Sequence, residues 1–466
     1  MEKRLRKRAT AAVSCSHRII WIRMKPLRQS SSILTVISRR TANNGLGSKP
    51  AIYKRRRMMA LTMGMNTGSS VDGIDVVLCE IEMDTDNQPK APKFLGGATY
   101  EWPKELEALV RKCYSLEITL PELARLDYAV GALLADRCRT FMQENDIDYH
   151  DILALGVDGQ VTYLEQPKHD IIDSMTQEQK EDWIGRWYNG PYPCGFWLGE
   201  TSIISSLTNI NTITHFRAAD HVTGGNGGPL MQYFDYILFR HQEEPVMTLN
   251  IGGIANAHLA QKDRSQMYAF DTGPGNTMLD YTAKKFFGVS YDKNGEISSR
   301  GKVNEEVMAQ LLSHPFFDRP IPRSPWLTDF SFGYADKLFA QFPQVKPEDF
   351  MKTFAHFTGE AIVRNMKDNI PKEQLEKVKV MYASGGGVRN QTIMGHLQEI
   401  MPYDIRLTTS DEIGIPAAYK ECIKFATLAF ASINGVADNI PAASHSGMYN
   451  ILGRIHYAPW RAKGIF

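Results

Sequence analysis

Three glycine-rich turns, each placed directly after a short apolar run, constrain the fold of this 466-residue chain most strongly. They begin at Asn66-Thr67-Gly68, Asn250-Ile251-Gly252 and Ser384-Gly385-Gly386. A turn without Cβ atoms lets backbone N–H groups approach a phosphate closely. One such turn can simply end a strand. Three of them, with an Asp-Thr-Gly-Pro-Gly-Asn loop at 271–276, favour a chain that wraps a nucleotide between two lobes.

The same order of elements occurs twice in the chain. Ala60–Met65 and Ile74–Ile81 predict a hairpin around the first turn, and Val246–Ile251 and Ile254–Leu259 predict another around the second. Helical spacing of apolar residues predicts helices at 106–114, 121–145, 198–207, 280–287, 305–313, 349–370 and 416–433. We therefore expect two α/β lobes with a ligand between them.

A long excursion separates two of these elements. Residues 165–195 mix charges and amides with aromatic residues and prolines, which predicts an amphipathic helix near a ligand mouth. From the breaks in the pattern we expect lobe I to comprise 58–245 plus 441–466, and lobe II to comprise 246–440.

The charge distribution sets the N-terminal segment apart. The formal net charge is +1, yet residues 1–57 contain sixteen Lys or Arg and one acid, Glu2, so the remainder carries −14. An acidic body argues against nucleic acid as the main partner. No apolar run of about 18 residues predicts a membrane helix. We interpret 1–57 as a basic, disordered extension, with a transit peptide or sequence upstream of the true start as open alternatives.

The six cysteines are scattered and form no C-x-x-C pair. In a chain of this length that pattern predicts buried thiols in a reducing compartment. We therefore expect a cytoplasmic location, and the Arg- and Ser-rich N-terminus leaves mitochondrial import open.

Two carboxylates are candidates for phosphoryl-transfer chemistry, which needs phosphate donors, a divalent cation and a group that deprotonates or orients the nucleophile. The glycine turns supply the first, and the Walker and protein-kinase patterns are absent. Asp220 follows a predicted strand beside Arg217 and is the candidate base; a helix N-cap or an ion pair explains it equally well. Glu421, taken alone, is typical of an ordinary solvated residue.

Other polar residues near the turns leave both interpretations open. Asp72 and Asp75 flank the first turn and need no function there. The Gly159-Gln160 pair could form a hydrogen bond with a sugar hydroxyl, or it could only satisfy polar groups of a loop.

Taken together, these motifs resemble the anhydro-N-acetylmuramic acid kinase family, from about Ala60 to Tyr457. The family's G-T-S-x-D-G-[VI]-D is matched at 68–75, and its D-F-R-x-x-D at 215–220. The stretches 250–256, 270–276 and 384–387 are essentially intact. The match at 414–426 includes Glu421.

The resemblance implies a two-lobed α/β fold of the actin/sugar-kinase/Hsp70 ATPase type, with ATP in the cleft and lobe I on the sugar side. It implies an ATP- and Mg²⁺-dependent kinase that opens a 1,6-anhydro sugar and phosphorylates O6. Asp220 would be the base, and Asp220 and Glu421 would hold the metal. The residues expected to hold the nucleotide are Gly68, Ser69, Ser70, Asp72, Gly73, Asn250, Gly252, Gly253, Asp271, Gly273, Gly275, Asn276, Gly385, Gly386, Gly387 and Asn390. Those expected to bind the sugar are Asp75, Asp158, Gln160 and Arg217. A homodimer is expected from the resemblance alone.

The departures from the family pattern cluster on the sugar side. The family's Ser-His-Gly-Gln is replaced at 157–160, where Asp158 stands in place of the His. Its Gln-Gly-Ala-Pro is altered at 226–229, and its K-[ST]-T-G-R-E is altered at 323–328. We therefore expect a changed substrate, such as levoglucosan or another anhydrohexose. An ordinary sugar kinase of the same fold and a catalytically silent nucleotide- or sugar-binding protein are the alternatives.

Overall fold

The computed structural model describes residues 20–21, 59–68, 71, 73–228, 230–325 and 329–459. Most of the predicted N-terminal extension, 1–57, therefore lies outside the described residues. The same holds for three predicted nucleotide-binding residues, Ser69, Ser70 and Asp72.

A seven-stranded sheet forms the centre of the first lobe, with the strand order β1-β4-β3-β2-β5-β8-β14. Its strands are β1 (Ile20–Trp21), β2 (Met59–Asn66), β3 (Ile74–Glu82), β4 (Lys93–Tyr100), β5 (Ile152–Val157), β8 (Thr212–Thr214) and β14 (Arg454–His456). β2 and β3 form the predicted antiparallel hairpin, and β5 runs parallel to β2. The strand β14 was not predicted; through it the C-terminal segment returns to the first sheet.

A five-stranded sheet forms the centre of the second lobe, in the order β11-β10-β9-β12-β13. Its strands are β9 (Val246–Ile251), β10 (Ile254–Ala260), β11 (Tyr268–Pro274), β12 (Val380–Ser384) and β13 (Arg406–Thr409). β9 and β10 form the second predicted hairpin, and β12 runs parallel to both β9 and β13.

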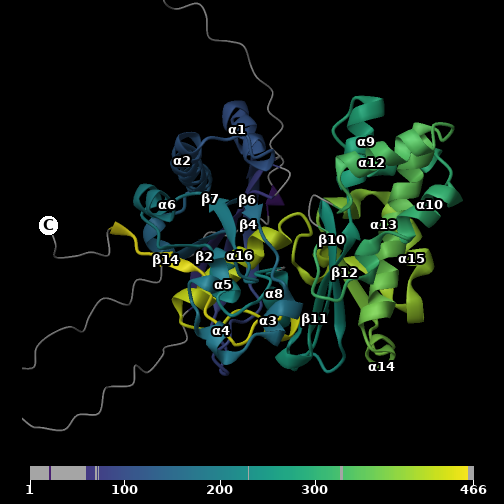
Figure 1. The fold of residues 1–466 in the computed structure, drawn as a ribbon. Helices are drawn as coiled ribbons and strands as arrows, with labels where there is room; N and C mark the ends of the chain where they lie inside the picture. The colour runs from purple at the N-terminus through teal and green to yellow at the C-terminus, as the bar shows by residue number, and fades with distance from the viewer. Residues whose placement is uncertain are drawn as a thin grey trace, which may run out of the picture.

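The two sheets share one topology. In each lobe three antiparallel strands are followed by two parallel ones, because β4-β3-β2-β5-β8 has the same order and directions as β11-β10-β9-β12-β13. This duplication is the topology of the actin/sugar-kinase/Hsp70 ATPase fold, so the predicted fold class is confirmed. The lobes lie side by side in Figure 1, with the second lobe in green.

Helices cover both sheets. The first lobe carries α1 (Lys104–Tyr114), α2 (Leu120–Glu144), α6 (Thr201–Thr208) and α8 (Met231–Phe239); the second carries α9 (Thr277–Phe287), α10 (Glu305–Leu312), α12 (Phe332–Gln341), α13 (Pro347–Asn369) and α15 (Gln391–Ile400). Local sequence sets their starts. Thr119 and Glu122 form a reciprocal capping box before α2, and Pro347 occupies the first turn of α13.

The helix α16 (Lys420–Ile433) belongs to the first lobe by its packing, whereas the predicted range of lobe II, 246–440, includes it. It packs against β2, β3 and β5. The close approach depends on two strand glycines, because a Cβ at Gly64 would collide with the carbonyl oxygen of Cys422, and one at Gly156 with that of Phe425. The expected helix start at Pro416 was also wrong, since α16 begins at Lys420.

The excursion at 165–195 contains three short helices instead of one. These are α3 (His169–Ser174), α4 (Gln177–Glu181) and α5 (Gly185–Tyr188), and two antiparallel strands, β6 (Gln160–Leu164) and β7 (Gly195–Leu198), close its base. The predicted start of a helix at Leu198 was wrong. The backbone turns at Gly199, whose φ is +118°, and the side chain of Glu200 then caps the N-terminus of α6.

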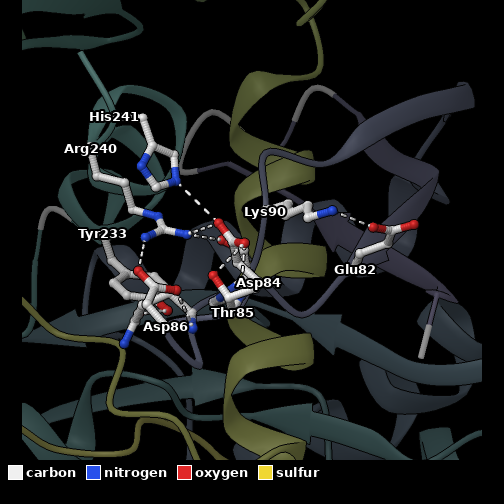
Figure 2. Close-up of polar contacts among 10 residues, drawn as sticks. Glu82, Asp84, Thr85, Asp86, Lys90, Tyr233, Arg240 and His241 are labelled. Atoms are coloured by element: carbon white, nitrogen blue, oxygen red, sulfur yellow. Dashed lines mark hydrogen bonds and ion pairs between the residues drawn. The ribbon is translucent and has the colours of Figure 1, made fainter. Parts of the chain in front are cut away.

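The loop between β3 and β4 is fastened to the end of α8 by a buried cation (Figure 2). Arg240 is 3% exposed in its side chain and pairs with Asp84 at 2.9 Å and with Asp86. His241 also reaches Asp84, at 3.1 Å. A backbone hydrogen bond from Thr85 is the main cause that lowers the pKa of Asp84. These contacts hold the loop between β3 and β4 against the end of α8.

The described cysteines are free thiols, and four of them are buried; Cys194 is exposed, against expectation. Within the described ranges, no helix has the length and apolar character needed to span a membrane.

Candidate active site

A single carboxylate joins the two lobes where their first glycine turns begin. Glu421, in the first turn of α16, accepts a hydrogen bond from Asn66 Nδ2 at 3.0 Å on Oε2. Its Oε1 accepts one from Asn250 Nδ2 at 2.7 Å. Asn66 ends β2, and Asn250 is the penultimate residue of β9. The structure thus places a residue that looked unremarkable in the sequence at the centre of the duplicated fold.

The glycine turns of the second lobe are packed against one another. The N–H groups of Gly275 and Asn276 donate to the carbonyl oxygens of Gly253 and Gly252, each at 2.8 Å. A Cβ at Gly275 would collide with the Gly252 carbonyl, and one at Gly387 would collide with the Ile251 side chain. By contrast, a Cβ at Gly386 would meet no heavy atom within 4 Å. Some of the predicted glycines are therefore required for packing, and Gly386 faces open space.

Asp220 is buried within a cage of donors. It lies on α7 (Ala218–His221) and is 1% exposed. Its Oδ2 accepts the Gly227 N–H at 2.9 Å, and its Oδ1 accepts Asn439 Nδ2 at 2.9 Å and Ser444 Oγ at 3.0 Å. Burial raises the pKa of Asp220, and these hydrogen bonds, with one from Ser446, oppose the rise. The helix-cap alternative is not what the structure shows, since these donors come from other segments.

Arg217 connects Asp220 to the altered motif around Asp158. Arg217 donates to the Gly227 carbonyl oxygen at 2.8 Å, and its Nη2 lies 3.4 Å from Asp158 Oδ2. The guanidinium also lies 5.6 Å from the centre of the Trp197 ring, within range of a cation–π interaction. Gly227 therefore binds Asp220 with its N–H and Arg217 with its carbonyl.

Asp271 reaches this group from the second lobe. Burial raises the pKa of Asp271 to about 6, and a hydrogen bond from Ser324 and the charges of Arg217 and Arg323 oppose that rise. The predicted nucleotide residue thus interacts with the predicted sugar residue Arg217 and with the altered segment at 323–328, of which 326–328 lie outside the described residues.

Two of the predicted residues are engaged in local structure. Gln160 is fully buried, and its Nε2 donates to the Gly68 carbonyl and to the Tyr114 hydroxyl, both at 2.9 Å. Asn390 caps α15 by accepting from the N–H groups of Thr392 and Ile393. Gln160 thus fixes the first turn, as its loop-satisfying interpretation expected.

The remaining predicted residues lie close to the turns. Asp75 accepts a hydrogen bond from Thr99 at 2.5 Å. Gly68, Gly273 and Gly385 have positive φ angles of 62°, 137° and 85°, so their turns depend on glycine. A Cβ at Gly73 would lie 2.8 Å from the Thr99 side chain, and the Gly73 carbonyl accepts from Trp102 Nε1 at 3.4 Å.

A pocket of about 540 Å³ is lined in part by Thr223 and Ser446, two residues that hydrogen-bond to Asp220, although Asp220 itself does not line it. It is lined by Ile172, Asp173, Lys180, Tyr192, Thr223, Pro441, Ala442, His445, Ser446 and Gly447. Thr223 and Ser446 are joined by a hydrogen bond of 2.6 Å. The excursion therefore forms one wall of a pocket, and the C-terminal segment forms another.

Several residues of this site were not predicted. Asn66 could have been identified from the sequence, because it precedes its glycine turn as Asn250 does. Asn439 and Ser444 had none, because they lie more than 200 residues from Asp220 in the chain. Lys424, three residues after Glu421, is 6% exposed and interacts electrostatically with Glu421, Asp158 and Arg217.

Comparison with known proteins shows the family to which the chain is similar. The family model described as anhydro-N-acetylmuramic acid kinase matches residues 60–458. The kinase of that name from Francisella tularensis subsp. novicida (strain U112) is 31% identical over 403 residues, covering 85% of this chain and 98% of the relative. The one from Pasteurella multocida (strain Pm70) is 29% identical over 395 residues, covering 84% and 96%.

Solved structures match more weakly. The activator of 2-hydroxyisocaproyl-CoA dehydratase from Clostridium difficile with bound ADPNP has a TM-score of 0.35 and 11% identity, covering 80% of this chain and 96% of that one. A ROK family glucokinase from Streptomyces griseus in complex with glucose and AMPPNP has a TM-score of 0.33 and 8% identity, covering 80% and 99%. Likenesses this low carry no argument about function.

The duplicated fold, its interlobe carboxylate and the named kinase relatives define the class of this protein, a phosphotransferase with an alcohol group as acceptor. Within that class, the chain belongs to the anhydro-N-acetylmuramic acid kinase family.

Proposed function

We propose that this protein is an ATP-dependent kinase that opens a 1,6-anhydro sugar and phosphorylates its O6. The observation that carries the proposal is the position of Glu421, held by Asn66 of one lobe and Asn250 of the other at the start of two glycine turns. That position suits the phosphates of a nucleotide bound between the lobes. Family membership supports the sugar acceptor.

Glu421 is the residue that fits a Mg²⁺ ion carried by the nucleotide. Mg²⁺ in such sites is held by one or two carboxylates, with phosphate oxygens and waters completing the shell. Each oxygen of Glu421 accepts one amide hydrogen bond, and a carboxylate offers about four acceptor positions in all. When bound, the ion would neutralise charge on the phosphates. No three His, Cys, Asp or Glu side chains in the described ranges gather into a metal site of their own.

Asp220 fits a metal poorly, in contrast to the expectation from the resemblance. Donors from Gly227, Asn439, Ser444 and Ser446 already surround it. Its proposed role is that of the general base. Burial raises its pKa, which makes the ionised carboxylate a stronger proton acceptor than an exposed aspartate.

A water molecule gives its proton to Asp220 while its oxygen bonds to the anomeric carbon, and the bond from that carbon to O6 breaks. O6 then bonds to the γ-phosphorus of ATP, and the bond to the bridging oxygen breaks to release ADP. The products are a sugar 6-phosphate with a free anomeric hydroxyl and ADP, and Asp220 returns the proton to solvent.

The ion pair between Asp158 and Arg217 supports a neutral sugar as substrate. At 3.4 Å, with side chains 15% and 19% exposed, Asp158 offsets the positive charge of Arg217. A guanidinium that is already paired attracts a second carboxylate less strongly, so an anhydrohexose such as levoglucosan suits this site better than an acidic anhydromuramic sugar.

A catalytically silent binding protein is the second candidate, and one observation favours it. The donors around Asp220 are also what a purely structural buried carboxylate requires. The kinase would turn over ATP in the presence of its sugar, whereas the silent protein would bind ligands without turnover.

The test is ADP release by the purified chain with ATP, Mg²⁺ and a panel of anhydrosugars and ordinary hexoses, with products identified by NMR. Release confined to anhydrosugars, with a reducing 6-phosphate as product, supports the ring-opening kinase. Release with ordinary hexoses would show a conventional sugar kinase. Thermal stabilisation by ATP without turnover on any sugar would show the silent protein.

A further inference from the structure

Lys424 is a buried cation in the candidate site without a partner of its own. It lies on α16 three residues after Glu421, so the two side chains share one side of the helix. Lys424 is 6% exposed. It forms no ion pair or hydrogen bond with any residue that the structure describes. Its Nζ lies 4.2 Å from the centre of the Phe425 ring.

A buried lysine without a counter-ion destabilises the folded state. Burying an ammonium group without a counter-ion disfavours its charged form, and burial is the main cause that lowers the pKa of Lys424. The cation–π contact recovers only part of that cost. Buried charges in proteins are normally paired or bind a ligand. The neighbouring Lys420 shows the paired case, because its Nζ lies 2.8 Å from Asp235.

The charged residues that act on Lys424 belong both to the proposed nucleotide side and to the proposed sugar side of the candidate site. Glu421, on the nucleotide side, attracts it, while Asp158 attracts it and Arg217 repels it from the sugar side. Lys424 therefore lies on the same side of α16 as Glu421 and within electrostatic range of both Asp158 and Arg217. In a kinase the group that moves between these two sides is the transferred phosphoryl group.

We propose that the Lys424 ammonium binds the γ-phosphoryl group of ATP, which completes its missing ion pair. This inference rests on the proposed kinase function. Three phosphoryl oxygens provide the acceptors that the described residues do not, and the contact persists as negative charge develops in the transition state. The role assigned to Lys424 is thus electrostatic and requires no change in its protonation.

The experiment compares a nucleotide that has the γ-phosphoryl group with one that lacks it. Dissociation constants for AMPPNP and ADP, each with Mg²⁺ and without sugar, are measured by calorimetry on the full chain and on Lys424→Met. Methionine keeps the length of the side chain and removes the charge. We expect AMPPNP to bind roughly 10- to 100-fold more weakly to the variant, while ADP changes by less than about 3-fold. Lys424→Arg should recover part of the AMPPNP affinity.

Two controls keep the result interpretable. Lys337→Met removes an exposed lysine of α12 and should leave both constants unchanged. If Lys424→Met fails to fold, Lys424→Gln and Lys424→Arg are measured against each other, with weaker AMPPNP binding expected only for the neutral variant.

Several outcomes would overturn the inference. Wild-type affinity for AMPPNP in Lys424→Met would show that the ammonium does not contact the γ-phosphoryl group. Equal weakening of both nucleotides would show a general structural role. Recovery of Lys424→Met by an added Asp158→Asn change would show that Lys424 is only a counter-ion for Asp158. If the wild-type chain binds neither nucleotide, the proposed function itself fails together with this inference.

Discussion

Asn66 and Asn250 occupy equivalent positions in the two lobes and donate their side-chain amides to opposite oxygens of one carboxylate, Glu421, at 3.0 and 2.7 Å. Each asparagine lies at the end of the central strand of its sheet, next to a glycine turn. A contact of this kind couples the relative position of the lobes to the geometry of the site. The two asparagines that precede the duplicated glycine turns thus bind the same carboxylate.

The Glu421 contacts predict that charge at this position matters for catalysis more than for folding. Glu421→Gln keeps the shape and can still accept one amide hydrogen bond, but it removes the charge proposed to hold Mg²⁺. We expect kcat to fall by roughly 100-fold or more, with a small change in thermal midpoint. Steady-state kinetics across a Mg²⁺ titration and calorimetry measure both quantities. Wild-type kcat in Glu421→Gln would contradict the assignment.

The burial of Asp220 predicts the loss of turnover without the loss of nucleotide binding. Asp220→Asn should lower kcat by about 10²–10⁴-fold, the range typical of general-base catalysis, while AMPPNP still raises the melting temperature. Because the base acts in its ionised form and burial raises its pKa, wild-type activity should fall as pH decreases through a value above that of an ordinary aspartate. Unchanged kcat in Asp220→Asn would rule out the base.

The Asp158–Arg217 pair predicts that a substitution at Asp158 changes the preference between neutral and acidic sugars. Asp158→His restores the residue type that the family motif carries and removes the negative charge 3.4 Å from Arg217. We expect kcat/KM to fall for neutral anhydrohexoses and to rise for an anhydro sugar that bears a carboxylate, with a relative change of roughly 10-fold. Competition assays with the two substrates measure the ratio directly. An unchanged ratio would place sugar selection elsewhere in the site.

The triple glycine after β12 provides a matched pair of substitutions. Gly387→Ala should destabilise the fold, because the new Cβ would collide with the Ile251 side chain. Gly386→Ala meets no heavy atom within 4 Å and should fold normally, yet it should weaken AMPPNP binding if the turn holds phosphates. Thermal midpoints with and without AMPPNP distinguish the two effects. Normal AMPPNP binding by Gly386→Ala would remove this turn from the nucleotide site.

Asp438 predicts a pH dependence of stability that is independent of catalysis. It is fully buried, and its carboxylate accepts the Leu452 N–H at 2.6 Å and the Ser432 hydroxyl at 3.0 Å. Burial raises its pKa to about 7. Since the folded state holds this proton more tightly than the unfolded state does, the stability it contributes is complete below about pH 4 and is lost as pH rises to about 7.

The matching variant is Asp438→Asn, which is neutral at every pH. The free energy of unfolding should decrease by less between pH 5 and pH 8 in this variant than in the wild type, by on the order of a few kcal/mol. Asp271, whose pKa is raised to about 6, is present in both proteins, so its contribution cancels in the comparison. Parallel pH profiles from urea titrations would show that Asp438 is ionised throughout.

Much of the fold followed from local sequence. The apolar runs before Gly68 and Gly252, each followed by a second run, predicted both hairpins within a residue or two. The strands β4, β11 and β13 were not predicted, because all three carry polar or small residues that weaken the alternating pattern. In the described sheet, β11 and β13 also pair with a neighbour on one side only. The start of α16 was misplaced because a helix signal at Pro416 competes with the turns that precede Lys420.

The sequence alone determined which residue types stand at the turns, and through them the duplicated fold and the family. Backbone conformation at a glycine turn is a local property, so it can be read from a few neighbouring residues. Only the tertiary structure decided which polar side chains meet. Asn439 and Ser444 reach Asp220, and α16 brings Glu421 between the lobes, through contacts between residues far apart in the chain. Such contacts depend on how whole elements pack, and no local pattern encodes them.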